Sequence, residues 1–309
     1  MAPLTQTATS GWTRRRVLAC ALGSAIGAAI AGFELVDHGV LPGKQTLDEL
    51  DGACSVSSPA LTFAPPGPSH SGAFRSAARN RIVGYTIAYP PGHGPGSRLP
   101  LAVFLHGFGG DHTSTLGGLS LARALAARAN GQPLAPMALV SVDGGGLYWN
   151  PHPGDDPMAM IVAELLPMCR RLGLGRPPLP VGAIGISMGG YGALLLAEKQ
   201  PRLIRAVSSI SPAVWTSYSQ ARSANAGAFA SAADFASDDV ITHAPILDGV
   251  PVRVASGNDD PFHPGVVALV RALPKTAVVD LTAGCHDDSF FASQQHASLA
   301  FLADHLADA

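Results

Sequence analysis

The chain has 309 residues, of which 47% are hydrophobic and 14% are charged, and its formal net charge is −2. This length suits one large α/β domain or two small ones, and the composition, with 35 glycines and 26 prolines, is that of a folded and loop-rich protein. Beyond the N-terminal arginines there is no basic patch, which argues against nucleic acid or another polyanion as a partner.

The N-terminal residues 1–31 have the layout of an export signal. Arg14–Arg16 precede an uncharged apolar run, residues 17–31, that ends in the sequence Ala-Ile-Ala. A charged region, an apolar region and an A-x-A site predict a signal peptide, and the paired arginines resemble a twin-arginine export signal. The alternative is a retained membrane anchor, because the apolar stretch continues over residues 17–36 with only Glu34 interrupting it. We therefore expect a secreted or cell-envelope protein, with membrane association through residues 17–36 as the alternative.

The rest of the chain divides into an extension and a folded domain. Residues 32–75 are of mixed composition, with four prolines between positions 57 and 71, and are interpreted as an N-terminal extension and linker. The folded domain is predicted at residues 76–309. Within it, residues 216–247 are rich in Ala, Ser and Asp without a clear period, and are interpreted as an inserted cap or lid.

Apolar segments in this domain alternate between strand and helix character. Strands are predicted at 81–89, 101–105, 138–142, 181–186, 204–210, 251–256 and 277–281, and helices at 119–129, 156–172, 193–198, 266–273 and 292–306. Because the central strands are apolar throughout, they predict a doubly wound, mostly parallel sheet with helices on both faces. Ligands of such sheets bind at the carboxyl ends of the strands.

The stretch Gly185-Ile186-Ser187-Met188-Gly189 lies between the buried strand and the next helix. A serine at a tight strand–turn–helix junction is typical of a nucleophile elbow, and small residues are needed two positions before and after it. The G-x-S-x-G pattern is weak by itself in a chain this rich in Gly and Ser. The interpretation of Ser187 as a nucleophile therefore requires an acid and a base at the ends of other strands.

Two later strands are followed by such residues. Asp259 and Asp260 come after the strand at 251–256, and His286 follows the last strand. The order Ser187, Asp, His286 is that of α/β-hydrolases. In that chemistry the serine is the nucleophile, the histidine the base, and the aspartate holds and stabilises the imidazole. Asp260 is preferred as the acid because it lies three residues past a glycine and precedes a proline, and Asp259 is the alternative.

The backbone N–H groups of Met188 and Phe108 are the candidate oxyanion donors. Met188 follows the nucleophile, and Phe108 belongs to a glycine-rich loop after the strand at 101–105. His106 in this loop is interpreted as a brace rather than a proton carrier. Trp149 and Trp215 are candidates for the substrate pocket, with ordinary core packing as the alternative.

No metal or other cofactor is expected, because the histidines are scattered without ligand spacing. Three cysteines follow the signal: Cys54, Cys169 and Cys285. An oxidising compartment would pair two of them, and three pairings are open, as is the alternative of buried thiols. A bridge at Cys285 would hold the loop of the candidate base, His286.

Three segments carry a resemblance to a known family: Leu105-His106-Gly107-Phe108-Gly109-Gly110, Gly185 to Ala193, and Gly284-Cys285-His286. They resemble the Putative esterase (esterase D-like) family of α/β-hydrolases, which includes S-formylglutathione hydrolases, feruloyl esterases and antigen 85 mycolyltransferases. The resemblance implies the α/β-hydrolase fold, Ser187, Asp260 and His286 as the triad, and Phe108 and Met188 as oxyanion donors. The signal and the composition resemble exported actinobacterial members.

The sequence thus predicts an exported serine esterase that acts on a small-molecule or lipid ester through an acyl-enzyme. One alternative is an acyltransferase on the same triad, moving the acyl group to a sugar or lipid alcohol in the cell envelope. Another is a non-catalytic binding protein on a hydrolase scaffold. The intact set of candidate residues argues against the latter.

Overall fold

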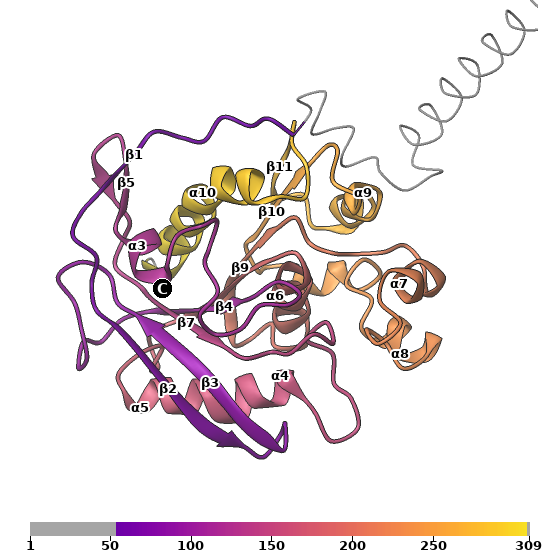
Figure 1. Ribbon diagram of the computed structural model, residues 1–309, viewed down its shortest axis with the longest axis horizontal. Helices are drawn as coiled ribbons and strands as arrows, with labels where there is room; N and C mark the ends of the chain where they lie inside the picture. Colours follow the sequence, from indigo (N-terminus) through magenta and orange to yellow (C-terminus); the bar gives the residue numbers. More distant parts are fainter. Residues whose placement is uncertain (1–53, 308–309) are drawn as a thin grey trace, which may run out of the picture. The chain divides into compact units, whose positions relative to one another are not determined.

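The computed structural model describes residues 54–307, and within them the predicted doubly wound sheet is present (Figure 1). Its eight strands have the order β2-β3-β7-β4-β8-β9-β10-β11. β2, β3 and β7 are antiparallel to one another in turn, and each pair from β7 to β11 is parallel. The strands are Ser69–Ser76 (β2), Arg81–Ala88 (β3), Leu101–Leu105 (β4), Ala138–Val142 (β7), Val181–Ile186 (β8), Ile204–Ile210 (β9), Val252–Gly257 (β10) and Val278–Thr282 (β11).

Helices cover both faces of the sheet, and each face has its own apolar core. Along β4, Leu101, Val103 and Leu105 belong to one core, while Ala102 and Phe104 belong to the other. This alternation explains why a central strand is apolar at every position. The first core packs against α4–α5, α6 and α9, and the second against α3 and α10. The helices are Leu121–Leu125 (α3), Pro157–Met160 (α4), the π-helical turn Ile161–Leu165 (η1), Leu166–Arg171 (α5), Met188–Lys199 (α6), His263–Ala272 (α9) and Asp288–Ala307 (α10).

The helix predicted from Asp156 begins as expected. The Asp156 carboxylate accepts a hydrogen bond from the N–H of Ala159 at 2.8 Å, and Pro157 occupies the first turn. An aspartate cap satisfies an N–H that has no partner inside the helix, and proline has no N–H to lose there. α4, η1 and α5 then follow one another without a break.

The stretch expected to be a linker is partly folded, which corrects the predicted boundary at residue 76. Residues 61–63 form β1 and residues 69–76 form β2, the outermost strand of the main sheet. β2 pairs with β3 along its whole length. The prolines of this region lie before β2, where they remove no N–H from the sheet.

The helix expected over residues 119–129 ends earlier than predicted. α3 ends at Leu125, and residues 127–129 form β5, which pairs with β1 and with β6 (Gln132–Pro133) in a small antiparallel sheet. Asn130 and Gly131, with φ of 51° and 78°, make the turn between β5 and β6. The pairing of β5 with β1 takes residues 127–129 out of the helix, and it is a tertiary contact that helical periodicity does not report.

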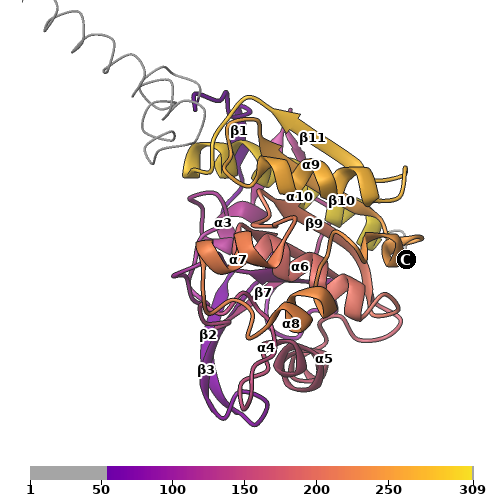
Figure 2. The same cartoon turned by 90° about the vertical axis from the view of Figure 1, so that its right-hand side faces the viewer.

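The insertion predicted at residues 216–247 contains only helical elements and loops. An ion pair and a carboxyl–imidazole contact hold it to the end of α6: Lys199 Nζ lies 2.9 Å from the Asp238 carboxylate, and Glu198 Oε1 lies 2.8 Å from His243 Nδ1. Figure 2 turns this side toward the reader. The elements are Tyr218–Ala224 (α7), Ala232–Ser237 (α8) and the 3-10 helix Ala244–Leu247 (η2).

No helix within residues 54–307 is long and apolar enough to cross a membrane. The predicted signal at 1–31, the alternative anchor at 17–36 and the rest of the extension up to residue 53 lie outside the described residues.

The buried Glu198 predicts a pH dependence of stability. Burial raises its pKa to about 7, above the value of about 4.3 for an unfolded chain, while the neighbouring His243 and Lys199 act to lower it. The stabilising effect of the protonated form is complete below the unfolded pKa and is lost as the pH rises through about 7. Between pH 5 and pH 8 the free energy of unfolding should fall by about 1–2 kcal/mol more in wild type than in Glu198→Gln.

Urea denaturation across this pH range measures the effect, with Asp248→Asn as the exposed-carboxylate control. If the free energy of unfolding changed with pH in the same way in wild type and Glu198→Gln, the predicted role of Glu198 would be contradicted.

Candidate active site

Ser187 occupies the sharp turn between β8 and α6. Its φ of 56° and ψ of −121° are strained for a residue with a side chain. A Cβ on Gly185 would overlap the carbonyl oxygen of Gly189, and a Cβ on Gly189 would overlap the carbonyl oxygen of Leu105. Only glycine therefore permits this approach of β4, β8 and α6, as the elbow interpretation requires.

A chain of hydrogen bonds joins the three side chains that the sequence singled out. His286 Nε2 lies 2.8 Å from Ser187 Oγ, and His286 Nδ1 lies 2.8 Å from Asp260 Oδ2. The ionised carboxylate can only accept, so Nδ1 carries the proton and Nε2 is left to accept from the serine hydroxyl. Asp260 is 3% exposed, and its other oxygen accepts the N–H of Phe262 at 2.8 Å. The arrangement can remove a proton from Ser187 and stabilise the resulting imidazolium.

Asp259 and Asp287 make other contacts. The backbone N–H of Asp259 donates to the carbonyl of Gly284 at 3.0 Å, whereas the carboxylate that contacts His286 is that of Asp260. Asp287 Oδ1 accepts the N–H of Phe290 at 2.9 Å at the start of α10. Asp287 therefore caps the start of α10.

The loop after β4 lies against the nucleophile turn. A Cβ on Gly107 would be 3.7 Å from the Cβ of Ser187. Within residues 54–307, neither the N–H of Phe108 nor that of Met188 donates to a protein acceptor. Both predicted donors are thus on the two segments that border Ser187.

His106 braces this loop from inside the protein. It is fully buried; its Nδ1 lies 2.8 Å from the carbonyl of Gly107, and its Nε2 accepts the N–H of Gly144 at 2.9 Å. Burial lowers the pKa of His106, which keeps the imidazole neutral and able to serve as donor and acceptor at once. It therefore joins the loop after β4 to the loop after β7.

A cavity of about 540 Å³ opens at Ser187 and His286. Its wall combines three phenylalanines and one isoleucine with four glycines and five polar residues, Ser187 and His286 among them. Besides the two reactive side chains it is lined by Phe104, Gly107, Phe108, Gly110, Ser114, Thr115, Gly117, Gly118, Ile186, Asp288 and Phe291.

Neither of the two candidate tryptophans lines this cavity. Trp149 is fully buried, its ring contacts Gly144 and Gly192, and its indole N–H donates to the carbonyl of His106 at 3.3 Å. The structure thus shows core packing for Trp149, because two glycines make room for its ring beneath the loop after β7. Trp215 is 9% exposed and lines a separate cavity of about 610 Å³.

Residues 76–268, more than half of the chain, match the model of the family described as Putative esterase. The chain belongs to the Putative esterase family. Membership makes it an enzyme that acts on ester bonds.

Solved structures share the fold of this esterase. A ferulic acid esterase superposes with a TM-score of 0.64 at 18% identity, over 77% of this chain and 98% of that one. An S-formylglutathione hydrolase from Agrobacterium tumefaciens superposes with a TM-score of 0.62 at 17% identity, over 80% of this chain and 98% of that one. MPT51 from Mycobacterium tuberculosis superposes with a TM-score of 0.62 at 18% identity, over 78% of this chain and 99% of that one. These likenesses confirm the predicted α/β-hydrolase fold.

The sequence of this esterase did not predict two aromatic neighbours of His286. The ring centroids of Phe262 and Phe291 lie 5.0 Å and 5.2 Å from that of His286, both with edge-to-face geometry. Phe262 comes two residues after Asp260, so the sequence alone places it near the acid. Phe291 is on the first turn of α10, and no sequence signal linked it to the site.

The elbow packing predicts that Gly189→Ala is destabilising. The new methyl group would overlap the Leu105 carbonyl, and moving β4 away from α6 should lower the free energy of unfolding by about 2–4 kcal/mol. Urea denaturation measures it, with Gly94→Ala as control, since a methyl group there meets only Pro68 at 3.4 Å. Equal effects of the two substitutions would show that the elbow tolerates a side chain.

Proposed function

We propose that this esterase hydrolyses carboxylic esters with Ser187 as nucleophile, His286 as general base and acid, and Asp260 as the residue that orients the imidazole. The observation that carries the proposal is the continuous chain Ser187–His286–Asp260, with both hydrogen bonds at 2.8 Å. A serine hydroxyl is a weak nucleophile, and a base within hydrogen-bond reach is what activates it.

The reaction proceeds in two displacements. Ser187 Oγ attacks the ester carbonyl carbon while its proton passes to His286 Nε2, and that proton then leaves with the alcohol as the carbon–oxygen bond breaks. Water next attacks the acyl-serine, gives its proton to His286 Nε2, and releases the carboxylic acid as the proton returns to Ser187. Asp260 remains ionised and stabilises the imidazolium in both halves.

The developing oxyanion is stabilised by the backbone N–H groups of Met188 and Phe108. Their lack of protein acceptors among the described residues leaves both free to donate, and fixed donors need no rearrangement as charge develops. His106 supports the Phe108 segment from below through its two hydrogen bonds.

The cavity beside Ser187 supports a small-molecule ester as the substrate. About 540 Å³ lies within the range of small-ligand sites, and the three phenylalanines of the wall favour an apolar acyl group. Asp288 is the charged residue of the wall, so a negatively charged acyl group is disfavoured by like-charge repulsion.

We further propose that the protein is exported. The N-terminal arginines and apolar run support this, and so does the disulfide between Cys54 and Cys285, because disulfides persist in oxidising compartments.

Ser187→Ala and His286→Ala should each lower the kcat of p-nitrophenyl ester hydrolysis by at least about 1000-fold, since the members of a triad act as a unit. A series of acyl lengths, with circular dichroism to confirm folding, measures this. Trp215→Phe, outside the cavity, is the control for a change of side chain near the site. Activity of Ser187→Ala equal to wild type would overturn the proposed nucleophile.

The same assay separates hydrolysis from acyl transfer. With trehalose or another sugar added as acceptor, hydrolysis gives only the free acid, whereas a transferase forms the sugar ester. Accumulation of the sugar ester as the main product would replace hydrolysis by acyl transfer on the same residues.

Asp260→Asn should lower kcat by about 10³–10⁴-fold, because an amide opposite Nδ1 favours the wrong imidazole tautomer. Asp259→Asn is the matched control one residue away and should stay within about threefold of wild type. Steady-state kinetics of both variants measure this; a larger loss in Asp259→Asn would assign the acid to Asp259.

A further inference from the structure

We propose that the Cys54–Cys285 disulfide and the chain that follows Cys54 position His286 for catalysis. The inference rests on the proposed role of His286 as the base. Cys54 and Cys285 are 231 residues apart in sequence, and Cys285 directly precedes His286. The bridge therefore fixes the backbone one residue from the imidazole.

The strand that leads to His286 is weakly held by the sheet. β11 is the outermost strand, and within the described residues it pairs only with β10. Val278 and Val279 on it are 47% and 40% exposed. An edge strand with little buried surface opens more readily than a central one, so the loop after β11 needs another support.

The segment after Cys54 supplies that support. A Cβ on Gly284 would lie 2.9 Å from Val56 Cγ1, so the Val56 side chain packs directly on the loop. Residues 55–57 also share the wall of a cavity with Thr282 and Ala283, at the end of β11. This segment thus runs beside the exposed edge just before His286.

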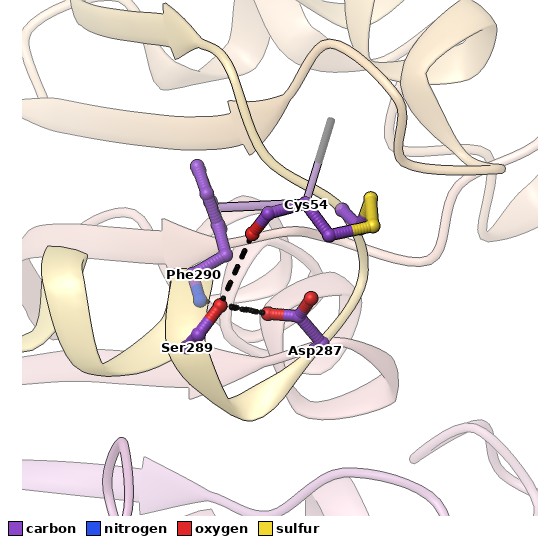
Figure 3. Close-up of a disulfide and its surroundings, with 5 residues drawn as sticks. Cys54, Asp287, Ser289 and Phe290 are labelled. Atoms are coloured by element: carbon purple, nitrogen blue, oxygen red, sulfur yellow. Dashed lines mark hydrogen bonds between the residues drawn. A yellow bond between two sulfur atoms is a disulfide. The ribbon is translucent and has the colours of Figure 1, made fainter. Parts of the chain in front are cut away.

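Figure 3 shows how the bridge joins the start of α10. The Ser289 hydroxyl donates to Asp287 Oδ1 at 2.7 Å and lies 3.4 Å from the carbonyl oxygen of Cys54. Phe290 is fully buried in the second core, and its N–H binds Asp287. His286 therefore lies between two fixed neighbours, Cys285 on the disulfide and Asp287 on the helix cap.

This support matters because His286 must hold two short hydrogen bonds at once, to Ser187 and to Asp260. A shift of the order of 1 Å in a reacting group can lower a rate by about 100-fold. Without the bridge the loop keeps the α10 anchor but loses the one on the β11 side. We expect the chemical step to slow while substrate binding, which uses the cavity wall, changes little.

Cys54→Ala tests this in the full-length protein, with Cys169→Ala as the control. Cys169 is the free cysteine of the described residues and is buried at α5. At a temperature where both variants are folded by circular dichroism, Cys54→Ala should show kcat reduced by about 10–100-fold and KM within threefold. Its low-field proton resonance from His286 Nδ1–H should be broadened or lost. Cys169→Ala should match wild type in kcat, in KM and in the resonance.

Reduction of the folded wild type gives the same comparison without a folding step. A phosphine reductant is oxidised to the phosphine oxide with the oxygen of water, and the disulfide takes up two electrons and two protons as two thiols. The kcat should fall as in Cys54→Ala and recover when oxidised glutathione reforms the bridge.

A folded Cys54→Ala, or a reduced wild type, that keeps both kcat and the resonance would overturn the inference. If wild type shows no ester hydrolysis, the proposed function fails, and the resonance alone decides whether the bridge orders His286.

Discussion

The close approach of β4, β8 and the start of α6 is the constraint on which the other features of the site depend. Gly185 and Gly189 allow the backbones to meet where any side chain would overlap a carbonyl. This contact forces Ser187 into its strained conformation and sets Met188 at the start of a helix. It also brings the loop after β4 against the nucleophile turn. The serine and both candidate oxyanion segments are therefore placed by one packing contact.

The remaining reactive groups come from the ends of two other parallel strands. Asp260 follows β10 and His286 follows β11, so both reach the edge of the sheet at which Ser187 lies. Central strands hold the serine rigidly, because both of their faces are covered by an apolar core. The base, by contrast, leaves the exposed edge strand. This difference explains why additional contacts collect around His286: two aromatic rings, a helix cap and a disulfide.

The loops around the cavity are braced by buried polar contacts. His106 joins the loops after β4 and β7, and Arg79, which is 3% exposed, pairs with Asp155 at 2.6 Å and also donates to the carbonyl of Asp143. A buried charge or imidazole is stable only when its hydrogen bonds are satisfied, so each of these side chains fixes the loop that supplies its partners. Of the loops braced in this way, the one after β4 lines the cavity beside Ser187.

The sequence by itself determined the central strands, the elbow and the order of serine, acid and base. These depend on local patterns: continuous apolar runs, glycines at fixed spacing and polar residues just past strand ends. Only the tertiary structure decided which aspartate contacts His286, that Trp149 is core, that residues 127–129 leave the helix for a small sheet, and that Cys54 pairs with Cys285. Each of these is a contact between segments far apart in the chain, and local propensity carries no information about such partners.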